Sequence, residues 1–223
     1  MSRSAPLCLA VLISGRGSNM HAIAQACAAG HINASIAQVI SDQPAALGIK
    51  TAHHLGLATK IIARAAFTDA AAFEAELARA LDEHSPGLIA FAGFMRILSP
   101  AFVTRYAGQM LNIHPSLLPH YRGLHTHRRV LAAGDAEHGA SVHFVTPELD
   151  AGPVVLQSRV AVQTGDTEQS LAARVLASEH IIYPEVIGWF ADGRLTLRKG
   201  QVWFDGAPLN APLVEDMRVA APH

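Results

Sequence analysis

The chain has 223 residues, a length at which one hydrophobic core can bury most of the surface that an unfolded chain exposes, so a single domain over residues 1–223 is expected. Half of the residues are hydrophobic, 16% are charged, and 17 Lys and Arg nearly balance 18 Asp and Glu. This balance argues against binding to nucleic acid or to an anionic membrane, and it favours a small-molecule partner.

The N-terminal segment and the cysteines favour a cytoplasmic location. The apolar run Leu7 to Ile13 is too short to span a bilayer and leads into a glycine-rich turn, so no targeting segment is predicted. The two cysteines, Cys8 and Cys27, cannot supply a disulfide framework and are expected to be small buried apolar residues. A reducing compartment follows from both observations.

Strands and helices alternate through the first half of the chain. Strands are predicted at residues 7–13, 35–41, 59–63 and 88–92, and helices at 20–29, 45–55 and from 68 or 69 to about 85. The run Leu88 to Ala92 is apolar on both faces, which is typical of a central strand in a parallel sheet. This pattern predicts an α/β protein with a Rossmann-like, mostly parallel central sheet and flanking helices.

The alternation weakens in the second half, which is expected to form an antiparallel C-terminal extension. A helix is predicted at residues 99–106, strands at 110–114, 141–146 and 154–162, a long helix that starts near Asp166 and bends near Pro184, and a hairpin at 195–198 and 201–204. A structured loop is expected between the strands at 141–146 and 154–162. The tail from Pro212 is expected to be flexible.

A glycine-rich turn follows the first predicted strand, at Ser14 to Asn19. Backbone N–H groups and a helix N-terminus would face an arriving anion there, so the turn suits a phosphate. The third glycine of the dinucleotide-binding motif is replaced by Met20, and no Gly-Lys-Ser/Thr sequence is present, which favours one phosphate over a pyrophosphate. A tight turn that needs glycine only for its backbone conformation is the alternative.

Two polar residues lie at the end of the predicted strand Met110 to His114. Residues two apart point to the same side of a strand, so Asn112 and His114 share one face while Ile113 packs on the other. Ligand crevices of open α/β sheets form at the carboxyl ends of the strands. The two residues are therefore candidate functional groups, and capping of the turn before Pro115 is the alternative.

Asp150 lies in a loop that can approach the same strand ends. An amide, an imidazole and a carboxylate around one pocket could transfer an acyl group to an amine. Asn112 and His114 could donate hydrogen bonds to a tetrahedral oxyanion, and Asp150 would favour the protonated imidazole and could relay a proton. No activated nucleophile is evident, since Ser116 lacks a Gly-x-Ser-x-Gly motif, so direct attack by the amine is the simpler scheme.

Four segments of the chain carry a resemblance to a known family. They are Ile-Ser-Gly-Arg-Gly-Ser-Asn (13–19), Ala-Gly-Phe-Met-Arg-Ile-Leu (92–98), Leu-Asn-Ile-His-Pro-Ser-Leu-Leu-Pro (111–119) and Glu-Leu-Asp-Ala-Gly-Pro (148–153). In order and spacing they resemble the phosphoribosylglycinamide formyltransferase family, the folate-dependent glycinamide ribonucleotide transformylases. The similarity covers nearly the whole chain, and the segments 123–128 and 178–180 add to it.

The resemblance implies the formyltransferase fold and transfer of a formyl group from the co-substrate 10-formyltetrahydrofolate to the amine of glycinamide ribonucleotide, without a metal. It implies a half that binds the ribonucleotide phosphate at residues 7–110 and a catalytic and folate-binding half at 111–210. The implied catalytic residues are Asn112, His114 and Asp150. The implied ribonucleotide-binding residues are Gly17, Ser18, Asn19 and Glu179. The implied folate-binding residues are Met95, Arg96, Ile97, Leu98, Asn112, Val145, Thr146 and Asp150.

One departure from the family concerns the folate tail. Some members place an arginine at the position of Ala70 to meet the glutamate of the folate, and Arg64 does not occupy that position. The thirteen histidines do not follow a metal-binding spacing, so no metal site is predicted. His125 and His127 are expected to support the site rather than to act directly, and His143 to form a hydrogen-bonded wall of the pocket.

Three other functions are weighed against formyl transfer to the ribonucleotide. A formyltetrahydrofolate hydrolase would use the same site with water, but that family carries an additional N-terminal regulatory domain. A transferase acting on initiator methionyl-tRNA carries an extra basic domain. A mononucleotide-binding module without catalysis would not need Asn112, His114 and Asp150 together. A monomer or weak homodimer acting on small molecules is expected.

Overall fold

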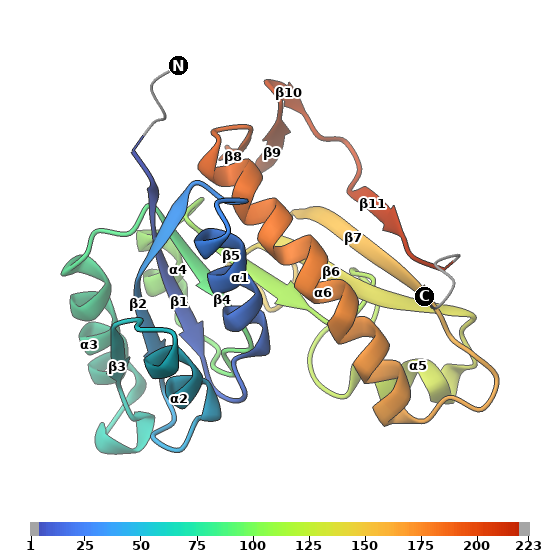
Figure 1. Cartoon of the computed structure of the whole chain (residues 1–223), viewed down its shortest axis with the longest axis horizontal. Coiled ribbons are helices and arrows are strands. Elements are labelled where there is room, and N and C mark those ends of the chain that lie inside the picture. Colours follow the sequence, from blue (N-terminus) through green and yellow to red (C-terminus); the bar gives the residue numbers. More distant parts are fainter. Residues whose placement is uncertain (1–4, 219–223) are drawn as a thin grey trace.

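The computed structural model describes residues 5–218, and within this range eight strands form one central sheet with helices on both faces (Figure 1). The strands are β1 (Leu7–Ile13), β2 (Ala34–Ser41), β3 (Thr59–Ile61), β4 (Leu88–Phe91), β5 (Met110–His114), β6 (Glu137–Phe144), β7 (Val154–Ala161) and β11 (Leu213–Asp216). Their order across the sheet is β11-β7-β6-β5-β4-β1-β2-β3. A second sheet of three strands follows the last helix, with β8 (Leu195–Arg198), β9 (Gln201–Phe204) and β10 (Ala207–Pro208).

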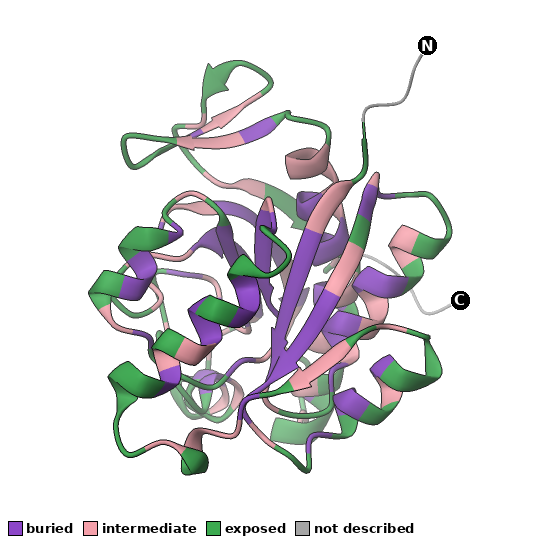
Figure 2. Cartoon of the chain, turned by 90° about the vertical axis from the view of Figure 1, so that its left-hand side faces the viewer, coloured by how far each residue is buried: buried purple, intermediate pink, exposed green. Residues whose placement is uncertain are grey.

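The helices cover the sheet because its central strands are apolar on both faces. In β1, Leu9, Val11 and Ile13 belong to one buried cluster, whereas Ala10 and Leu12 belong to the other. The first cluster includes residues of α1 (Ser18–Ala28), α2 (Leu47–His54), α5 (Thr126–Ala133) and α6 (Glu168–Ala191). The second includes residues of α3 (Ala70–Asp82) and α4 (Pro100–Arg105), and a short 3₁₀ helix, η1 (Arg64–Ala66), precedes α3. Figure 2 shows the buried strands between these two layers.

Among the eight strands of this sheet, β6 alone runs against the direction of the others. Strands β1 to β5 pair in parallel, while β5 with β6 and β6 with β7 pair antiparallel. The Rossmann-like, mostly parallel sheet with an antiparallel C-terminal part is therefore confirmed. Because the carboxyl ends of parallel strands lie at one edge, the turn after β1, the segment after β4 and the end of β5 all meet there.

The largest differences from the predicted boundaries are at the start of β6 and in the C-terminal tail. β6 begins at Glu137 rather than at residue 141, because its first residues pair with the end of β7. The prediction of a flexible tail from Pro212 is wrong for Leu213–Asp216, which pairs in parallel with β7. Without β11, β7 would be an edge strand with unpaired backbone groups, and pairing satisfies them. The end of the tail, residues 219–223, lies outside the described residues.

The long helix α6 is fixed to the sheet by a buried tyrosine. The single Tyr183 hydroxyl hydrogen is shared between the carbonyl oxygens of Phe91 and Leu111, which lie 3.1 and 2.9 Å from the hydroxyl oxygen, so it joins α6 to β4 and β5. Burial raises the pKa of Tyr183 well above its usual value, so the hydroxyl stays a donor. One helical turn earlier, Glu179 points toward α1. The anchor therefore determines where Glu179 lies.

Candidate active site

The turn between β1 and α1 leaves backbone donors open at the start of the helix. Gly17 is the residue before α1, has a left-handed backbone with φ of 73°, and has no side chain that could cap the helix. A Cβ at Gly17 would lie 2.7 Å from Cα of Gly48, so the close approach of α2 also requires glycine here. The N–H groups of the first helical turn, which have no partner within the helix, and the helix dipole suit an anion at Ser18 and Asn19.

Asn19 connects this turn to α6. Its amide Nδ2 donates a hydrogen bond of 2.6 Å to Glu179 Oε2, and both residues are buried. Burial raises the pKa of Glu179 to about 7, and the hydrogen bond from Asn19 opposes this shift only in part. The Asn19 Oδ1 atom is buried without a partner. The structure thus brings together residues that the sequence places 160 positions apart.

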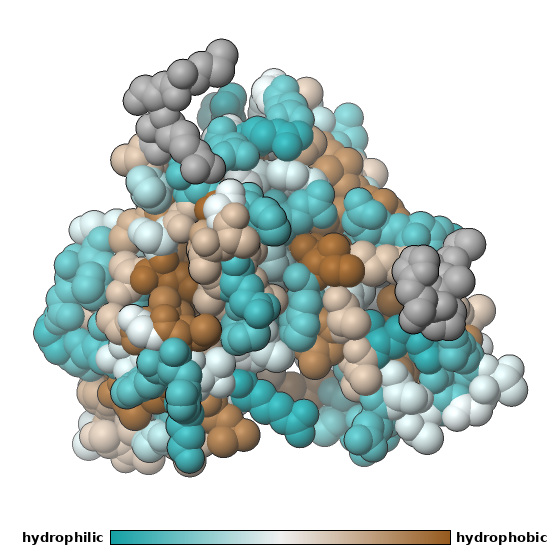
Figure 3. Space-filling model, viewed as in Figure 1, coloured by the Kyte–Doolittle hydropathy of each residue, from teal (hydrophilic) through white to brown (hydrophobic). Residues whose placement is uncertain are grey.

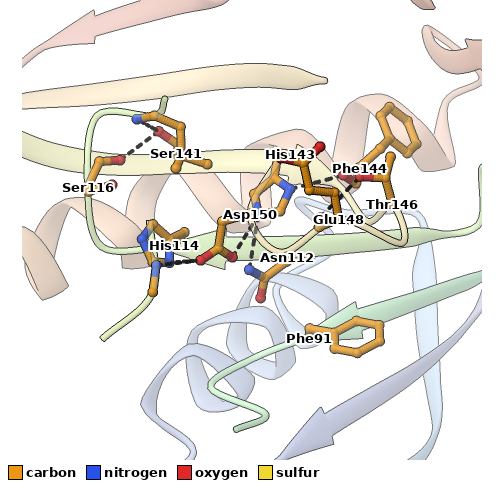
Figure 4. A network of polar contacts seen from close by, with 12 residues as sticks. Phe91, Asn112, His114, Ser116, Ser141, His143, Phe144, Thr146, Glu148 and Asp150 are labelled. Carbon is orange, nitrogen blue, oxygen red and sulfur yellow. Dashed lines mark hydrogen bonds and ion pairs between the residues drawn. The ribbon is translucent and has the colours of Figure 1, made fainter. Parts of the chain in front are cut away.

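Asp150 folds back beside His114, as the sequence analysis required. Asp150 Oδ2 lies 3.4 Å from His114 Nδ1, and both side chains are less than one-tenth exposed. The same carboxylate oxygen accepts a hydrogen bond of 2.9 Å from the backbone N–H of Gly123. Asp150 has a left-handed backbone with φ of 48°, which is uncommon outside glycine. Figure 4 shows Asp150 between His114 and Asn112.

Asn112 is oriented by a neighbour across the sheet. Asn112 on β5 and His143 on β6 are paired in register, and Asn112 Nδ2 lies 3.1 Å from His143 Nε2. His143 Nδ1 lies 2.9 Å from the Phe144 carbonyl, which can only accept, so Nδ1 carries the proton and Nε2 accepts from Asn112. Burial lowers the pKa of His143, which favours this neutral form. His143 is thus the hydrogen-bonded pocket wall that the sequence predicted.

The orientation of His114 is set by a backbone carbonyl. His114 Nε2 lies 3.0 Å from the Tyr121 carbonyl oxygen, and that oxygen can only accept. Nε2 therefore carries a proton, and Nδ1 is the nitrogen that faces Asp150. The sequence could not predict this contact, because the acceptor is the backbone carbonyl of Tyr121 and every residue type has one.

The segment after β4 is held by a buried carboxylate that the sequence analysis missed. The Asp42 side chain is fully buried at the end of β2, where it accepts hydrogen bonds from Ser14 Oγ and from Arg96 Nε, each at 2.5 Å. The Ser14 hydroxyl also accepts a hydrogen bond of 2.8 Å from the Met95 N–H. Asp42 therefore joins the glycine-rich turn to the segment 95–98. Asp42 directly follows Ser41 at the end of a strand, and this position is the feature of the sequence that could have identified it as a site residue.

A pocket of about 100 Å³ opens between this segment and the loop after β6. Its lining includes Arg96, Ile97, Leu98, Asn112, His143, Val145, Thr146 and Asp150. Met95 and Ile97 are largely exposed, so apolar side chains lie at this segment of the pocket's mouth. Seven of the eight predicted folate-binding residues line the pocket, and Met95 is the exception.

A larger groove of about 650 Å³ lies between α1 and α6. His21, His180 and Trp189 are among the described residues that line it, and none of the predicted site residues is. Figure 3 shows that hydrophobic side chains on the face of the molecule seen in Figure 1 occur in small separate groups. Asn112 and Asp150 line the smaller pocket, and Asp150 also contacts His114, so this pocket is the candidate active site.

The other histidines near the site are structural neighbours. His125 is the residue before α5, and His127 Nδ1 in α5 lies 3.0 Å from His138 Nε2 on β6. Burial lowers the pKa of both rings, that of His138 to about 4. His53 and His54 lie on α2 and are exposed. Among residues 5–218, no group of three or more His, Cys, Asp or Glu side chains is placed to hold a metal ion.

We expect the buried His138 to make the protein less stable in mild acid. Because its pKa is about 4 in the folded protein and 6.5 when unfolded, the unfolded chain binds more protons between these values, and stability falls as the pH drops from 6.5 to 4. The loss is on the order of 3 kcal/mol. Chemical unfolding followed at several pH values measures it.

The comparison between variants isolates this contribution. The contribution of Glu179 to stability changes with pH in the opposite direction. Its raised pKa gives stability that is lost as the pH rises from 4.5 to 7. The useful quantity is therefore the difference in unfolding free energy between the wild type and His138→Gln at each pH. His84→Gln, at an exposed position, is the control. Parallel pH curves for the wild type and His138→Gln would contradict the expectation.

A further expectation concerns the residues that could meet the folate tail. Ala70 is the exposed first residue of α3, and Arg64 donates a hydrogen bond from Nη1 to the Phe67 carbonyl, so neither supplies a free cation at that position.

The cysteines are not fully buried, since Cys8 and Cys27 are both half-buried. Within the described part of the chain, every helix is too short or too polar to cross a bilayer.

Comparison with known proteins places this geometry among its relatives. The formyl transferase family model matches residues 7–187. The chain is 52% identical over 201 residues to the phosphoribosylglycinamide formyltransferase of Escherichia coli, covering 90% of this chain and 95% of that protein. The solved structure of the phosphoribosylglycinamide formyltransferase from Coxiella burnetii superposes with a TM-score of 0.89 at 49% identity, covering 93% of this chain and 99% of that one.

A more distant structure shares the fold alone. The formyltetrahydrofolate deformylase from Pseudomonas syringae superposes with a TM-score of 0.82 at 22% identity. The match covers 89% of this chain and 66% of that one. At this identity the likeness shows a common architecture and carries no argument about the reaction.

Proposed function

The chain belongs to the formyl transferase family, and we propose that Asn112, His114 and Asp150 form its catalytic centre. It transfers the formyl group of 10-formyltetrahydrofolate to the amine of glycinamide ribonucleotide, giving formylglycinamide ribonucleotide and tetrahydrofolate in de novo purine biosynthesis. The observation that supports the catalytic assignment is the contact of His114 with Asp150, which lines the same pocket as Asn112.

Formyl transfer starts with attack of the ribonucleotide amine on the formyl carbon. The new C–N bond turns the formyl oxygen into an oxyanion, which needs hydrogen-bond donors. Asn112 has one amide hydrogen on His143 and a second one that can point to the oxyanion. His114 presents Nδ1 on the same strand face, and because Nε2 already carries a proton, Nδ1 donates when the ring is in its doubly protonated, positively charged form. Each such donor typically lowers the barrier by about 3 kcal/mol.

Collapse of the intermediate needs a proton on the departing nitrogen. The amine loses one proton, the bond from the formyl carbon to folate N10 breaks, and N10 gains a proton, so the reaction needs no other reactant. Asp150 can accept and return this proton, and its negative charge stabilises positive charge on His114 at 3.4 Å. Burial of both side chains strengthens that interaction.

The substrates are assigned to the two sides of this centre. For the ribonucleotide we assign the phosphate to the α1 N-terminus at Gly17, Ser18 and Asn19, and the ribose hydroxyls to Glu179. For the folate we assign the pterin to the pocket beside residues 95–98, with Val145, Thr146 and Asp150 on its other side. Backbone groups of Met95 to Leu98 are the polar partners in this assignment, which explains why the segment can be apolar.

The two halves of the chain are assigned to the two substrates in the same way. Residues 7–110 carry the phosphate-binding turn, and residues 111–210 carry the catalytic groups, Glu179 and one wall of the folate pocket. We place the reaction in the cytoplasm, in a monomer or weak homodimer that binds neither nucleic acid nor membrane. The near balance of 17 basic and 18 acidic residues supports this proposal.

One assay separates this function from hydrolysis. The purified protein, 10-formyltetrahydrofolate and glycinamide ribonucleotide should give tetrahydrofolate, followed by its absorbance, without added metal or nucleoside triphosphate. Omission of the ribonucleotide should remove nearly all turnover. An equal rate with and without the ribonucleotide would assign the site to a formyltetrahydrofolate hydrolase instead.

A further inference from the structure

We propose that Tyr121 is a positioning residue for His114, held in place by Asp135. This inference rests on the proposed catalytic role of His114. It adds two residues, neither of which lines the pocket. Their function is to keep a backbone carbonyl and a backbone N–H where the two catalytic side chains need them.

The first step is the contact between Tyr121 and His114. The Tyr121 carbonyl accepts a hydrogen bond from His114 Nε2 at 3.0 Å. This bond holds the proton on Nε2 and turns Nδ1 toward Asp150 Oδ2, at 3.4 Å. If the carbonyl moved away, either ring nitrogen could carry the proton of a neutral imidazole, and the ring could rotate. The carbonyl therefore selects the nitrogen that acts in the site.

The second step is that Tyr121 does not hold this position by backbone preference. Tyr121 has a left-handed backbone with φ of 56°, which is unfavourable for a residue with a large side chain. Its hydroxyl donates a hydrogen bond of 2.5 Å to Asp135 Oδ2, and the Arg129 guanidinium lies 5.2 Å from the centre of its ring. The hydrogen bond to Asp135 raises the pKa of Tyr121, so the hydroxyl remains a donor. The side chain thus supplies the anchor that the backbone lacks.

The third step is that the same segment also orients Asp150. The Gly123 N–H, two residues after Tyr121, donates to Asp150 Oδ2 at 2.9 Å. Between them, the Arg122 carbonyl accepts a hydrogen bond of 2.7 Å from Arg129, so α5 holds this segment at a second point. One anchored turn therefore contacts both His114 and Asp150, and the Tyr121–Asp135 bond fixes the end of the turn nearest His114.

The test begins with Tyr121→Phe, which removes the hydroxyl and keeps the ring over which Arg129 lies. We expect kcat to fall about ten- to a hundredfold, because small displacements of catalytic groups have effects of this size. The KM values for both substrates should stay near those of the wild type, because neither residue is assigned to substrate binding. An unchanged kcat would overturn the proposal.

Variants of Asp135 test the same bond from its other end and guard against a misfolded Tyr121→Phe protein. Asp135→Ala should reproduce the loss in kcat, whereas Asp135→Asn keeps an acceptor oxygen and should restore most of it. The double variant Tyr121→Phe with Asp135→Ala should lose no more than either single variant, because both remove one bond. Additive losses would overturn the coupling between the two residues.

A spectroscopic readout distinguishes positioning from general damage. The ¹⁵N chemical shifts of the His114 ring in the full chain report which nitrogen is protonated. The wild type should show the proton on Nε2, and Tyr121→Phe should show a mixture of the two forms. A variant that loses activity while His114 keeps its wild-type spectrum would overturn the proposal. The spectrum needs no substrate, so it holds even if the wild type were to fail the formyl transfer assay.

Discussion

The Asp150→Asn variant is expected to lower kcat by about a thousandfold while leaving the affinity for glycinamide ribonucleotide almost unchanged. The new amide oxygen can still accept the hydrogen bond from the Gly123 N–H, so the loop should keep its conformation. The amide cannot accept the proton of the attacking amine, and it carries no charge to stabilise positive charge on His114. Steady-state kinetics with both substrates varied measures the two effects separately.

The matched control for this variant is Glu179→Gln. Glu179 is assigned to the ribose, so this variant should raise the KM for the ribonucleotide and leave kcat much closer to the wild-type value. Thermal unfolding of both variants checks that they are folded. A normal kcat for Asp150→Asn would remove Asp150 from the mechanism, whatever its position in the structure.

Much of the fold could be predicted because its signals are local. The strands Met110–His114, Leu195–Arg198 and Gln201–Phe204 have the predicted bounds, since each is delimited by turn residues or by a change in periodicity. The alternation of side chains along β5 was enough to place Asn112 and His114 on one face. The sequence could not predict the distance from β5 to Asp150, because this distance depends on the path of the loop that carries Asp150.

The parts of the site that the sequence did not predict have a common feature: their residues carry no recognisable chemical signal in the sequence. The Tyr121 carbonyl and the Gly123 N–H act through the backbone, so the identity of the residue carries no chemical signal. Asp42 acts through an ion pair between its buried carboxylate and the exposed Arg96, and a lone acidic residue at a strand end resembles any turn residue in a sequence. The strand β11 was missed because four residues after a proline show too little alternation to predict pairing.

The site is therefore built from two kinds of contact with different tolerance to substitution. The reacting groups are side chains, and no other residue type reproduces an imidazole or a carboxylate there. The groups that orient them are largely backbone atoms, at Tyr121, Gly123 and Phe144, whose positions depend on neighbouring elements. Substitutions far from the pocket can consequently alter the reaction when they move one of these backbone groups.

Substitutions of His114 by its two closest amide analogues should differ in activity, because the structure assigns different tasks to the two ring nitrogens. A glutamine amide can reach the position of Nε2 and keep the contact with the Tyr121 carbonyl, but it leaves nothing at the position of Nδ1. An asparagine amide can place a neutral donor near Nδ1, beside Asp150, and abandons Tyr121. We expect His114→Gln to lower kcat by about 10³- to 10⁴-fold and His114→Asn by about 10²-fold.

The order of these two losses is the informative measurement, since both variants remove the imidazole. If Nδ1 donates to the oxyanion, the variant that retains a donor there keeps more of the stabilisation, even without the charge that Asp150 supports. Combining His114→Gln with Asp150→Asn should then add little to the larger single loss, because the two residues act as a unit. The reverse order, with His114→Gln the more active variant, would mean that Nε2 is the reacting nitrogen and that the Tyr121 contact breaks during the reaction.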